Sequence, residues 1–448
     1  MNKTTFKIFF AAFLIGNLSF VYGQCPTGNL VLSSQQSVDD FAINYPNCTD
    51  FPYNLTIHGA GGITNLNGLS QIESINGIFI IEGFLNLNDL SGLNNLNTIN
   101  GSFFFRGNDG ISNFNGLENL ETIENDFLIS DNNDLLNLSG LSSLQTINGQ
   151  LSISDNFKLV STDGIQSLTY INDGLLVTNN YFLSSFNGLN NLTSIGDGYI
   201  HIAHNGHLID LSGLETLTTV NGAIYIAFNV SLNSLNGLNS LTTVNGNFTI
   251  SGNNLITTLS ALSNLTEIDG NLQIDNIDSL SNLSGLENLN QINGSLTLLF
   301  ITNLTNIEAI RNLDSSTLTL LQIGGNNQLS QCNVESVCNY LSIPVNNANI
   351  STNSVGCNTR QEVEDACLLS NENYHLSELK IYPNPTNGTF EISGLKEGTI
   401  EIVDSQGRTV KEMSATESSY SISELSSGIY FVKITSEKSS ITKQLLKT

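Results

Sequence analysis

The sequence predicts an all-β protein: a right-handed β-solenoid of about eleven 24-residue coils with disulfide-stapled caps, followed by a small β-sandwich. Three observations in the 448-residue chain lead to this fold class. A small residue recurs at a fixed interval, apolar residues keep fixed offsets within each interval, and all six cysteines lie in the two flanks. A fixed period of this length is typical of a stacked repeat array.

The first 23 residues have the features of a secretory signal peptide. Two lysines precede an apolar run over residues 8–21, and small residues lead to a cleavage site before Gln24. A membrane anchor and a lipid-modified Cys25 are the alternatives. Polar residues interrupt the apolar run, which is already short for a membrane span. We therefore expect an exported chain with no transmembrane span after signal cleavage.

The repeat is anchored on the small residue of an Asn/Ser-Gly-Leu sequence. Ten intervals separate the anchors, nine of 24 residues and one of 25. The anchors are Gly68, Gly92, Gly116, Gly140, Gly164, Gly188, Gly213, Gly237, Ala261, Gly285 and Ala309. We assign the solenoid to residues 63–328.

Apolar spacing within one repeat predicts the path of a coil. Around Gly140, apolar residues fall three apart from Leu135 to Ile147 and then two apart at Leu151 and Ile153. Spacing of two indicates a strand with one buried face, whereas a strict spacing of three drifts off a helical face within two turns. We expect one strand per coil, followed by short extended segments. A glycine before the strand, Gly149 in this copy, suggests a corner with positive φ.

An asparagine recurs just after the strand in seven coils. We expect each side chain to bond turn backbone and its equivalents in neighbouring coils, because stacking hides those polar groups from water. The predicted role is structural and involves no ligand. The seven are Asn108, Asn132, Asn156, Asn180, Asn205, Asn229 and Asn253.

The cysteines predict a stapled cap at each end of the rod, over residues 24–62 and 329–370. Both ends of a solenoid are open sheet edges, so caps are required. Cys25 and Cys48 are the natural first pair. Zinc is the alternative for the other four, but they contain no Cys-x-x-Cys pair. These four, for which three disulfide connectivities are open, are Cys332, Cys338, Cys357 and Cys367.

Two stretches carry a resemblance to a known family. LSISDN, residues 151–156, is similar to a leucine-rich-repeat strand, and SVDDFAINYPNCTDFPYNLTIHG, residues 37–59, resembles the opening of the receptor L domain. The likeness covers roughly residues 25–370. It implies the helix-poor, ligand-binding solenoid of growth-factor-receptor ectodomains.

The tail divides into a polar linker, residues 371–379, and a domain over residues 380–448. Apolar and aromatic runs separated by Gly and Asn predict short antiparallel strands in a small sandwich. The motif residues are Tyr382, Pro383, Asn384, Pro385, Gly388, Asp404, Gly407, Arg408, Gly428, Tyr430, Lys443 and Lys447. With these motifs in order, the tail resembles the type IX secretion C-terminal sorting domain of Bacteroidetes.

That resemblance implies a partner and a destination. The partner is the type IX secretion machinery, and the destination lies across the outer membrane. The family's tails are removed, with release of the protein or attachment to surface lipopolysaccharide.

Charge argues against some partners. The chain carries a net charge of −26, and residues 24–379 hold 32 acidic residues against four basic ones, a balance of −28. Residues 380–448 are neutral, with eight of each sign. An acidic body repels nucleic acid and anionic lipid headgroups, so we expect no nucleic-acid partner.

No catalytic arrangement stands out. The chain has five histidines and lacks a Gly-x-Ser-x-Gly sequence or a phosphate-binding loop. We expect no enzymatic activity and no cofactor. The alternative is a metal site on His201, His204 and His207, which belong to the coil with the one-residue insertion.

A binding surface is the favoured function. Solenoids present one sheet face as a continuous array, and a contiguous apolar patch on such a face marks an interaction, although cross-strand stacking could also explain it. We expect a secreted or cell-surface recognition and adhesion protein. The alternatives are a structural matrix component and a non-catalytic carrier of a metal or glycan site. The outward positions expected to bind a protein or glycan are Ile80, Phe104, Leu128, Leu176, His201 and Tyr225.

Overall fold

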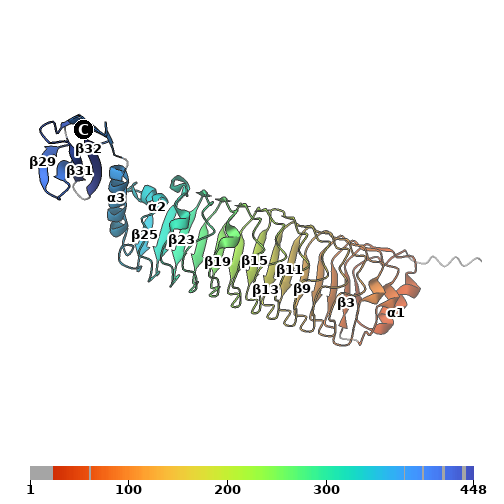
Figure 1. Ribbon diagram of the computed structural model, residues 1–448. Coiled ribbons are helices and arrows are strands. Elements are labelled where there is room, and N and C mark those ends of the chain that lie inside the picture. Colours follow the sequence, from red (N-terminus) through yellow and green to blue (C-terminus); the bar gives the residue numbers. More distant parts are fainter. Residues whose placement is uncertain (1–23, 60–61, 378, 396–397, 416–418, 436–439) are drawn as a thin grey trace, which may run out of the picture.

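The protein is a long rod with a small separate domain at its C-terminal end (Figure 1). The computed structural model describes residues 24–59, 62–377, 379–395, 398–415, 419–435 and 440–448. The expected signal peptide, residues 1–23, lies outside them. The chain winds once around the rod axis per repeat, so the predicted solenoid is confirmed.

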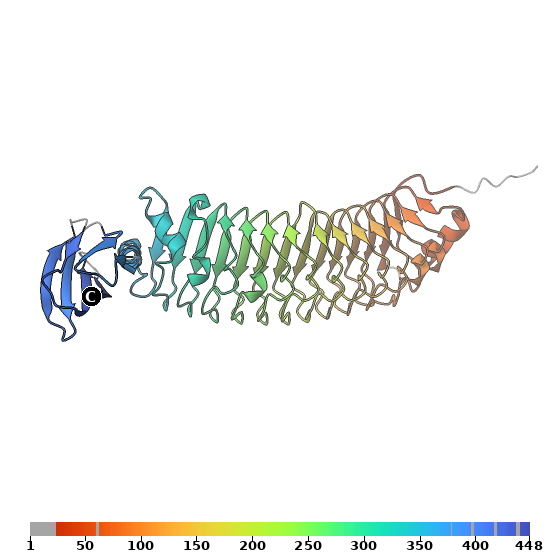
Figure 2. The ribbon, with the colours of Figure 1, turned by 45° about the horizontal axis from the view of Figure 1, so that its top comes forward.

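Two parallel sheets run along the rod (Figure 2), and each follows the order of the chain. The larger has 14 strands and extends from the N-terminal cap to the C-terminal cap. Its strands are β1 (Leu30–Leu32), β3 (Leu55–His58), β5 (Phe79–Glu82), β7 (Phe103–Arg106), β9 (Phe127–Ser130), β11 (Gln150–Ser154), β13 (Gly174–Thr178), β15 (Tyr199–Ala203), β17 (Ile224–Ala227), β19 (Phe248–Ser251), β21 (Leu272–Asp275), β23 (Ser295–Leu299), β24 (Leu320–Gly324) and β25 (Ala348–Ser351).

The second sheet has 11 strands of two residues each, and the sequence suggested only extended segments there. Its strands are β2 (Asp50–Phe51), β4 (Ser74–Ile75), β6 (Thr98–Ile99), β8 (Thr122–Ile123), β10 (Thr146–Ile147), β12 (Tyr170–Ile171), β14 (Ser194–Ile195), β16 (Thr219–Val220), β18 (Thr243–Val244), β20 (Glu267–Ile268) and β22 (Gln291–Ile292). Short 3-10 helices at Asn67–Leu69, Ser91–Leu93, Ser260–Leu262, Glu308–Ile310 and Ser315–Thr317 occupy some of the remaining turns.

Neighbouring coils stack in register. Leu151 lies opposite Phe127 in the preceding coil and Leu175 in the following one. Residues one repeat apart therefore form columns along the rod, and each column has one environment. The predicted spacing of apolar residues is confirmed, because Leu135, Leu151 and their partners in the Gly140 coil are all buried.

Aromatic stacking strengthens the core near the N-terminal end. The rings of Phe79, Phe103 and Phe127 occupy one inward column. Their centroids are 5.1 Å apart for the first pair and 4.9 Å for the second, and both pairs are stacked. Large stacked rings in one column bury much apolar area and add a favourable ring–ring contact to it.

The seven predicted asparagines form a continuous buried ladder. The Asn156 side chain donates from Nδ2 to the Ile129 carbonyl at 2.9 Å and to Asn180 Oδ1 at 3.2 Å. Its Oδ1 accepts a hydrogen bond from the Asn132 backbone N–H at 3.1 Å. All seven side chains are inaccessible to solvent, so the ladder satisfies polar groups that water cannot reach. Ile277 and Ile301 take the equivalent positions in two later coils, and Asn326 resumes the pattern.

The residue just before each ladder position is in the left-handed region. The values of φ run from +52° to +76°, whichever residue type is present. The column consists of Gly83, Gly107, Asp131, Asp155, Asn179, His204, Phe228, Gly252, Asn276, Phe300 and Gly325. The positive-φ corner therefore follows the long strand.

The sequence placed that corner wrongly at Gly149 and its equivalents, which precede the strand. Gly149 is not among the positive-φ residues, and glycine is required there for another reason. A Cβ at Gly149 would lie 2.4 Å from the Asn125 carbonyl carbon, because the coils approach closely at this corner. The anchor Gly140 has both constraints: its φ is +103°, and a Cβ would lie 2.1 Å from Phe114 backbone.

The N-terminal cap is a helix laid on the first coil. Helix α1 (Gln35–Asn44) begins at a capping box on Ser34 and buries Val38 and Phe41. It approaches so closely that a Cβ on Gly68 would lie 1.9 Å from the Val38 carbonyl oxygen. The predicted Cys25–Cys48 disulfide is present and ties the chain start to this cap.

The C-terminal cap contains α2 (Glu335–Leu341), β25 and α3 (Arg360–Ser377). Of the three possible connectivities, the structure has Cys332–Cys357 and Cys338–Cys367. Residues 371–377 were expected to form a linker but continue α3. The segment contains neither Gly nor Pro, so nothing in it stops a helix.

The C-terminal domain has its own core between two antiparallel sheets, as predicted for a small sandwich. One sheet contains β26 (Lys380–Tyr382), β27 (Thr389–Ser393) and β30 (Tyr420–Ser421). The other contains β28 (Thr399–Asp404), β29 (Thr409–Ser414), β31 (Gly428–Thr435) and β32 (Ser440–Lys447).

Removing one rung of the ladder should destabilise the rod. Asn156→Ala leaves the Asn132 N–H and the Ile129 carbonyl buried without these partners, so the free energy of unfolding should fall by about 2–4 kcal/mol. Urea unfolding followed by circular dichroism measures the change. Asn133→Ala, at an exposed side chain one residue from the ladder, should change it by less than about 0.5 kcal/mol. Equal effects of the two substitutions would contradict a structural ladder.

The anchor glycine should be less replaceable than glycine elsewhere. Gly140→Ala combines a disfavoured backbone conformation with a clash against Phe114, so we expect a loss of about 3 kcal/mol or more. Gly28→Ala is the matched control, because nothing lies within 4 Å of the Cβ it would add. The same unfolding assay tests both, and a Gly140→Ala protein as stable as the control would overturn the close approach of the coils.

Candidate functional site

The predicted ligand face is the outward side of the 14-stranded sheet. In-register pairing joins Ile80 to Phe104 and Phe104 to Leu128. It likewise joins Leu176 to His201 and His201 to Tyr225. The buried Ser152 separates the two groups, so the face carries two apolar clusters. All six predicted side chains are half-buried by their neighbours along the column.

Charged groups border the first cluster. Beside Ile80 and Phe104, the Arg106 guanidinium lies 2.6 Å from the Glu82 carboxylate. The His58 imidazole lies 4.0 Å from the same carboxylate. These groups project from the same strand face two residues further along β3, β5 and β7. The N-terminal cluster is thus an apolar surface with an ion-paired rim.

Aromatic residues make up most of the second cluster. The His201 and Tyr225 rings lie 4.7 Å apart at a 59° tilt. Burial lowers the pKa of His201, and the nearby His204 lowers it further. Tyr199, two residues before His201 on β15, is exposed on the same side and was missed. The two-residue alternation could have identified it.

The three histidines do not converge on one point. His201 packs on Tyr225, His204 stacks on Phe228 with centroids 5.2 Å apart, and His207 Nδ1 lies 2.9 Å from the Tyr181 carbonyl oxygen. Among the described residues, no group of three or more His, Cys, Asp or Glu side chains could hold a metal ion. The backbone turns left-handed at His204 and sends the three rings to different neighbours.

The most exposed apolar surface of the solenoid lies elsewhere, in the six residues that follow each long strand. We call this segment the post-strand corner. It holds eleven of the twelve exposed large apolar side chains between residues 63 and 328, the exception being Tyr199. They are Leu85, Leu136, Phe157, Val160, Tyr181, Phe182, Ile209, Phe228, Val230, Leu255 and Phe300.

Four of the corner side chains form one connected group, which we call the aromatic corner: Phe157, Tyr181, Phe182 and His207. The Phe157 and Tyr181 rings stack at 5.4 Å, and Phe182 meets them edge-on at 5.2 Å and 5.1 Å. His207 lies 4.7 Å from Tyr181 and 4.9 Å from Phe182. Phe157 and Tyr181 are each 47% exposed and Phe182 is 40% exposed.

Alignment of the repeats could have revealed this group. The two positions after the ladder asparagine are polar in most coils, for example Asn133 and Asp134, whereas Tyr181 and Phe182 occupy them here. Alternation along the strands does not reveal them, because they lie in the turn after the strand.

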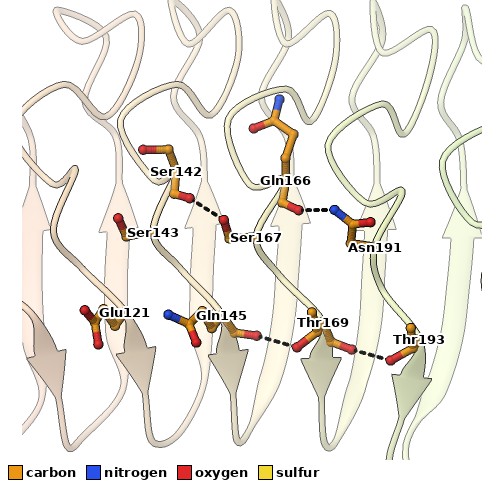
Figure 3. Close-up of a pocket in the computed structure, with 9 residues that line it drawn as sticks. All are labelled: Glu121, Ser142, Ser143, Gln145, Gln166, Ser167, Thr169, Asn191 and Thr193. Atoms are coloured by element: carbon orange, nitrogen blue, oxygen red, sulfur yellow. Dashed lines mark hydrogen bonds between the residues drawn. The ribbon is translucent and has the colours of Figure 1, made fainter.

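A shallow groove of about 610 Å³ runs along a different side of the rod, beside the short strands (Figure 3). Its lining is neutral and polar apart from Glu121. Several of the side chains already bond the preceding coil: Ser167 Oγ donates to the Ser142 carbonyl at 2.6 Å, and Asn191 Nδ2 donates to the Gln166 carbonyl at 2.8 Å. These contacts hold coils together, and the lining contains neither histidine nor paired carboxylates.

The tail motifs cluster on the strands of the C-terminal domain. Asn384 joins the Tyr-Pro-Asn-Pro segment to β32, because its Nδ2 donates to the Gln444 carbonyl at 2.7 Å and its Oδ1 accepts from Leu446 N–H at 2.9 Å. The buried Lys447 side chain on that strand donates to the Ser423 carbonyl at 3.0 Å. These contacts tie the start of the domain to its end.

A second motif closes the turn between β28 and β29. Asp404 accepts from the Gln406 and Arg408 backbone N–H groups at 2.9 Å and 3.0 Å, and Gly407 has φ +80°. Hydrogen bonds from Arg408 hold the pKa of the Asp404 carboxyl below its usual value. At β31, the Tyr430 hydroxyl donates to the Ser426 carbonyl at 2.8 Å. These motif positions maintain the domain's fold.

The pKa of His201 predicts a pH effect on stability. Its folded-state value lies below the unfolded one, so the folded protein binds this proton less readily. Stability is therefore full above the unfolded pKa of about 6.5 and falls as the pH drops below it. His201→Thr, which copies Thr249 in the same column, should lose less stability than the wild type between pH 7.5 and 5. Denaturation midpoints at the two pH values test this, and equal losses would contradict it.

Two families match this chain, one within the solenoid and one in the C-terminal domain. Residues 242–363 match the receptor L domain, and residues 380–448 match the secretion system C-terminal sorting domain. The opening segment, residues 37–59, and both apolar clusters of the sheet face lie outside these matches. No curated protein matches the chain.

Location follows from the second match. The sorting domain indicates export across the outer membrane to the cell surface or the extracellular space by the type IX machinery. Within the part of the chain that the structure describes, no helix has the length and apolar character needed to cross a membrane. Both families that the sequence resembles are thus found, although the receptor L domain match covers residues 242–363 and not the expected 25–370. The chain is a solenoid with a stretch similar to the receptor L domain, followed by a tail that matches the type IX secretion C-terminal sorting domain.

Proposed function

We propose that this protein is a non-enzymatic recognition and adhesion protein that binds a protein or glycan through the outward face of its long sheet. The solenoid holds this face rigidly, and the sorting domain delivers it outside the cell. Release of the rod or its attachment to the surface after tail removal belongs to the same proposal.

The proposal rests on a difference between coils in the outward column of the long sheet. In the outward column, three later coils have Thr249, Gln273 and Thr297, and these stack as well as the apolar residues do. The fold therefore does not require large apolar side chains at this position. Phe104 and Tyr225 are better explained by contact with a partner, since contiguous apolar surface is typical of interaction sites.

Absence of catalysis is part of the proposal. The groove beside the short strands is shallow, and its hydroxyl and amide groups bond neighbouring coils. Nucleophilic or acid–base chemistry needs a nucleophile and a base, or two carboxylates, held in one site. The groove lining offers one carboxylate, Glu121.

A paired substitution on the face tests the proposal. Phe104→Ser with Tyr225→Ser should weaken binding to retained proteins or arrayed glycans at least about tenfold, since each removes a central aromatic contact. The melting temperature should change little, because both side chains are only half-buried. Binding assays with the purified secreted protein and cell-adhesion assays provide the readout.

The matched control is Thr249→Ser with Thr297→Ser, which lies on the same column outside both clusters. The control should bind as the wild type does. Unchanged adhesion in the Phe104 and Tyr225 variant would refute the face as a ligand site. Self-assembly of the rod without any saturable partner would favour a structural matrix role instead.

A further inference from the structure

The aromatic corner differs from the equivalent positions in other coils of the same solenoid. Phe157 and Tyr181 each follow a ladder asparagine directly. The equivalent residue is Asn133 in the coil two before that of Tyr181, and Asn254 in the coil three after it. Those coils have asparagine at this one position, so folding does not require a ring there. Exposed rings that the fold does not require are evidence of an interaction surface.

The neighbouring coils show strain at the same corner. His204 and Phe228 are in the left-handed region, with φ of +59° and +55°. Bulky side chains rarely adopt this conformation, whereas Gly107 and Gly252 take it in the same column without cost. The His204 ring stacks on Phe228 at 5.2 Å, a separate ring pair in this coil and the next one. Exposed rings thus occupy strained backbone positions here, as Phe300 does on a distant corner.

Carboxylates border this surface on the side of the earlier coils. Asp155 lies two residues before Phe157, and Asp131 lies one coil further, about 4.8 Å away along the column. Both are exposed at the turn, and neither forms an ion pair within the described residues. The only lysine or arginine in these corners, Lys158, pairs with Asp134 at 2.5 Å. The rim of the aromatic corner is therefore negative.

We propose that the aromatic corner docks a basic protein segment, one in which apolar side chains lie next to lysine or arginine. The apolar side chains would cover Phe157, Tyr181 and Phe182, and the basic ones would meet Asp131 and Asp155. A second copy of this chain fits poorly, since two bodies of charge −28 repel each other. A glycan fits less well, because sugars bind to open ring faces, and Phe157 and Tyr181 cover one face of each other by stacking.

This surface is distinct from the sheet face. The corners concerned follow β11, β13 and β15 in the middle of the rod (Figure 1). Substitutions at the corner and on the face therefore give separate results, and one proposal can fail while the other holds.

The test uses the full secreted chain and labelled synthetic peptides. One peptide alternates leucine with lysine, a second has glutamate for lysine, and a third has serine for leucine. The variant Phe157→Asn, Tyr181→Asn, Phe182→Ser copies residues found at these positions in other coils, so it should fold. Its circular dichroism and melting temperature are measured first.

We expect the leucine–lysine peptide to bind the wild type and to bind the triple variant at least about tenfold more weakly by fluorescence anisotropy. Binding should fall at about 0.3 M salt, which screens the carboxylates. Two other variants should bind as the wild type does. One is Leu85→Asn with Phe300→Asn, exposed apolar residues on distant corners, and the other is the Phe104 and Tyr225 face variant.

Four outcomes would overturn the proposal. The first is equal binding by the wild type and the triple variant. The second is an equal loss in the Leu85 and Phe300 control. The third is binding of the glutamate or serine peptide as tight as that of the leucine–lysine peptide. The fourth is a glycan whose arrayed binding depends on Phe157 and Tyr181, which would assign the corner to carbohydrate.

Discussion

In-register stacking of coils is the constraint on which the rest of the structure depends. A residue in one coil faces the same residue position in the next, about 4.8 Å away. Backbone groups at a turn are then hidden by neighbours on both sides, and the ladder from Asn108 to Asn253 supplies the partners they need. The same closeness excludes a side chain at Gly140 and at Gly149. A lone coil could satisfy neither requirement, so the coils are stable only as an array.

Because every coil solves the same packing problem, a departure from the common pattern is informative. Thr249 shows that a small polar side chain is enough for strand pairing in the outward column. The large apolar side chain of Phe104 in the same column is therefore not required for folding. In the same way, Asn133 shows that the position of Phe157 and Tyr181 does not need an aromatic ring for folding. Function is thus inferred from differences between coils, and the features common to them account for the fold.

The period and the apolar offsets made the solenoid predictable, since a strand spacing of two and a strict spacing of three allow few other structures. The ladder was predictable from the same period, and the Cys25–Cys48 pair was predictable because these are the two cysteines of the N-terminal flank. The positive-φ corner was not, because glycine at Gly149 serves close approach whereas Asp131 and Phe228 bear the left-handed turn. Helix α3 continued past the expected boundary because no residue there ends it.

The candidate surfaces were only partly predictable. Alternation along the strands identified the outward column but not how far neighbours cover each side chain. Exposure at Phe157 depends on the path of the turn, which period and polarity do not specify. The pairing of Cys332 with Cys357 depends on how the cap folds back, and spacing alone left three choices.

The one 25-residue interval between anchor residues bears on how the rod could change in size. The extra residue lies between Ile195 and Tyr199, and the pairing of Ile195 with Val220 and of Ile200 with Ile224 continues beyond it. One irregular coil thus leaves its neighbours undisturbed. Whole coils could accordingly be gained by duplication or lost by deletion within the gene, each changing the length of the rod by about 4.8 Å while the caps and the sorting domain stay as they are.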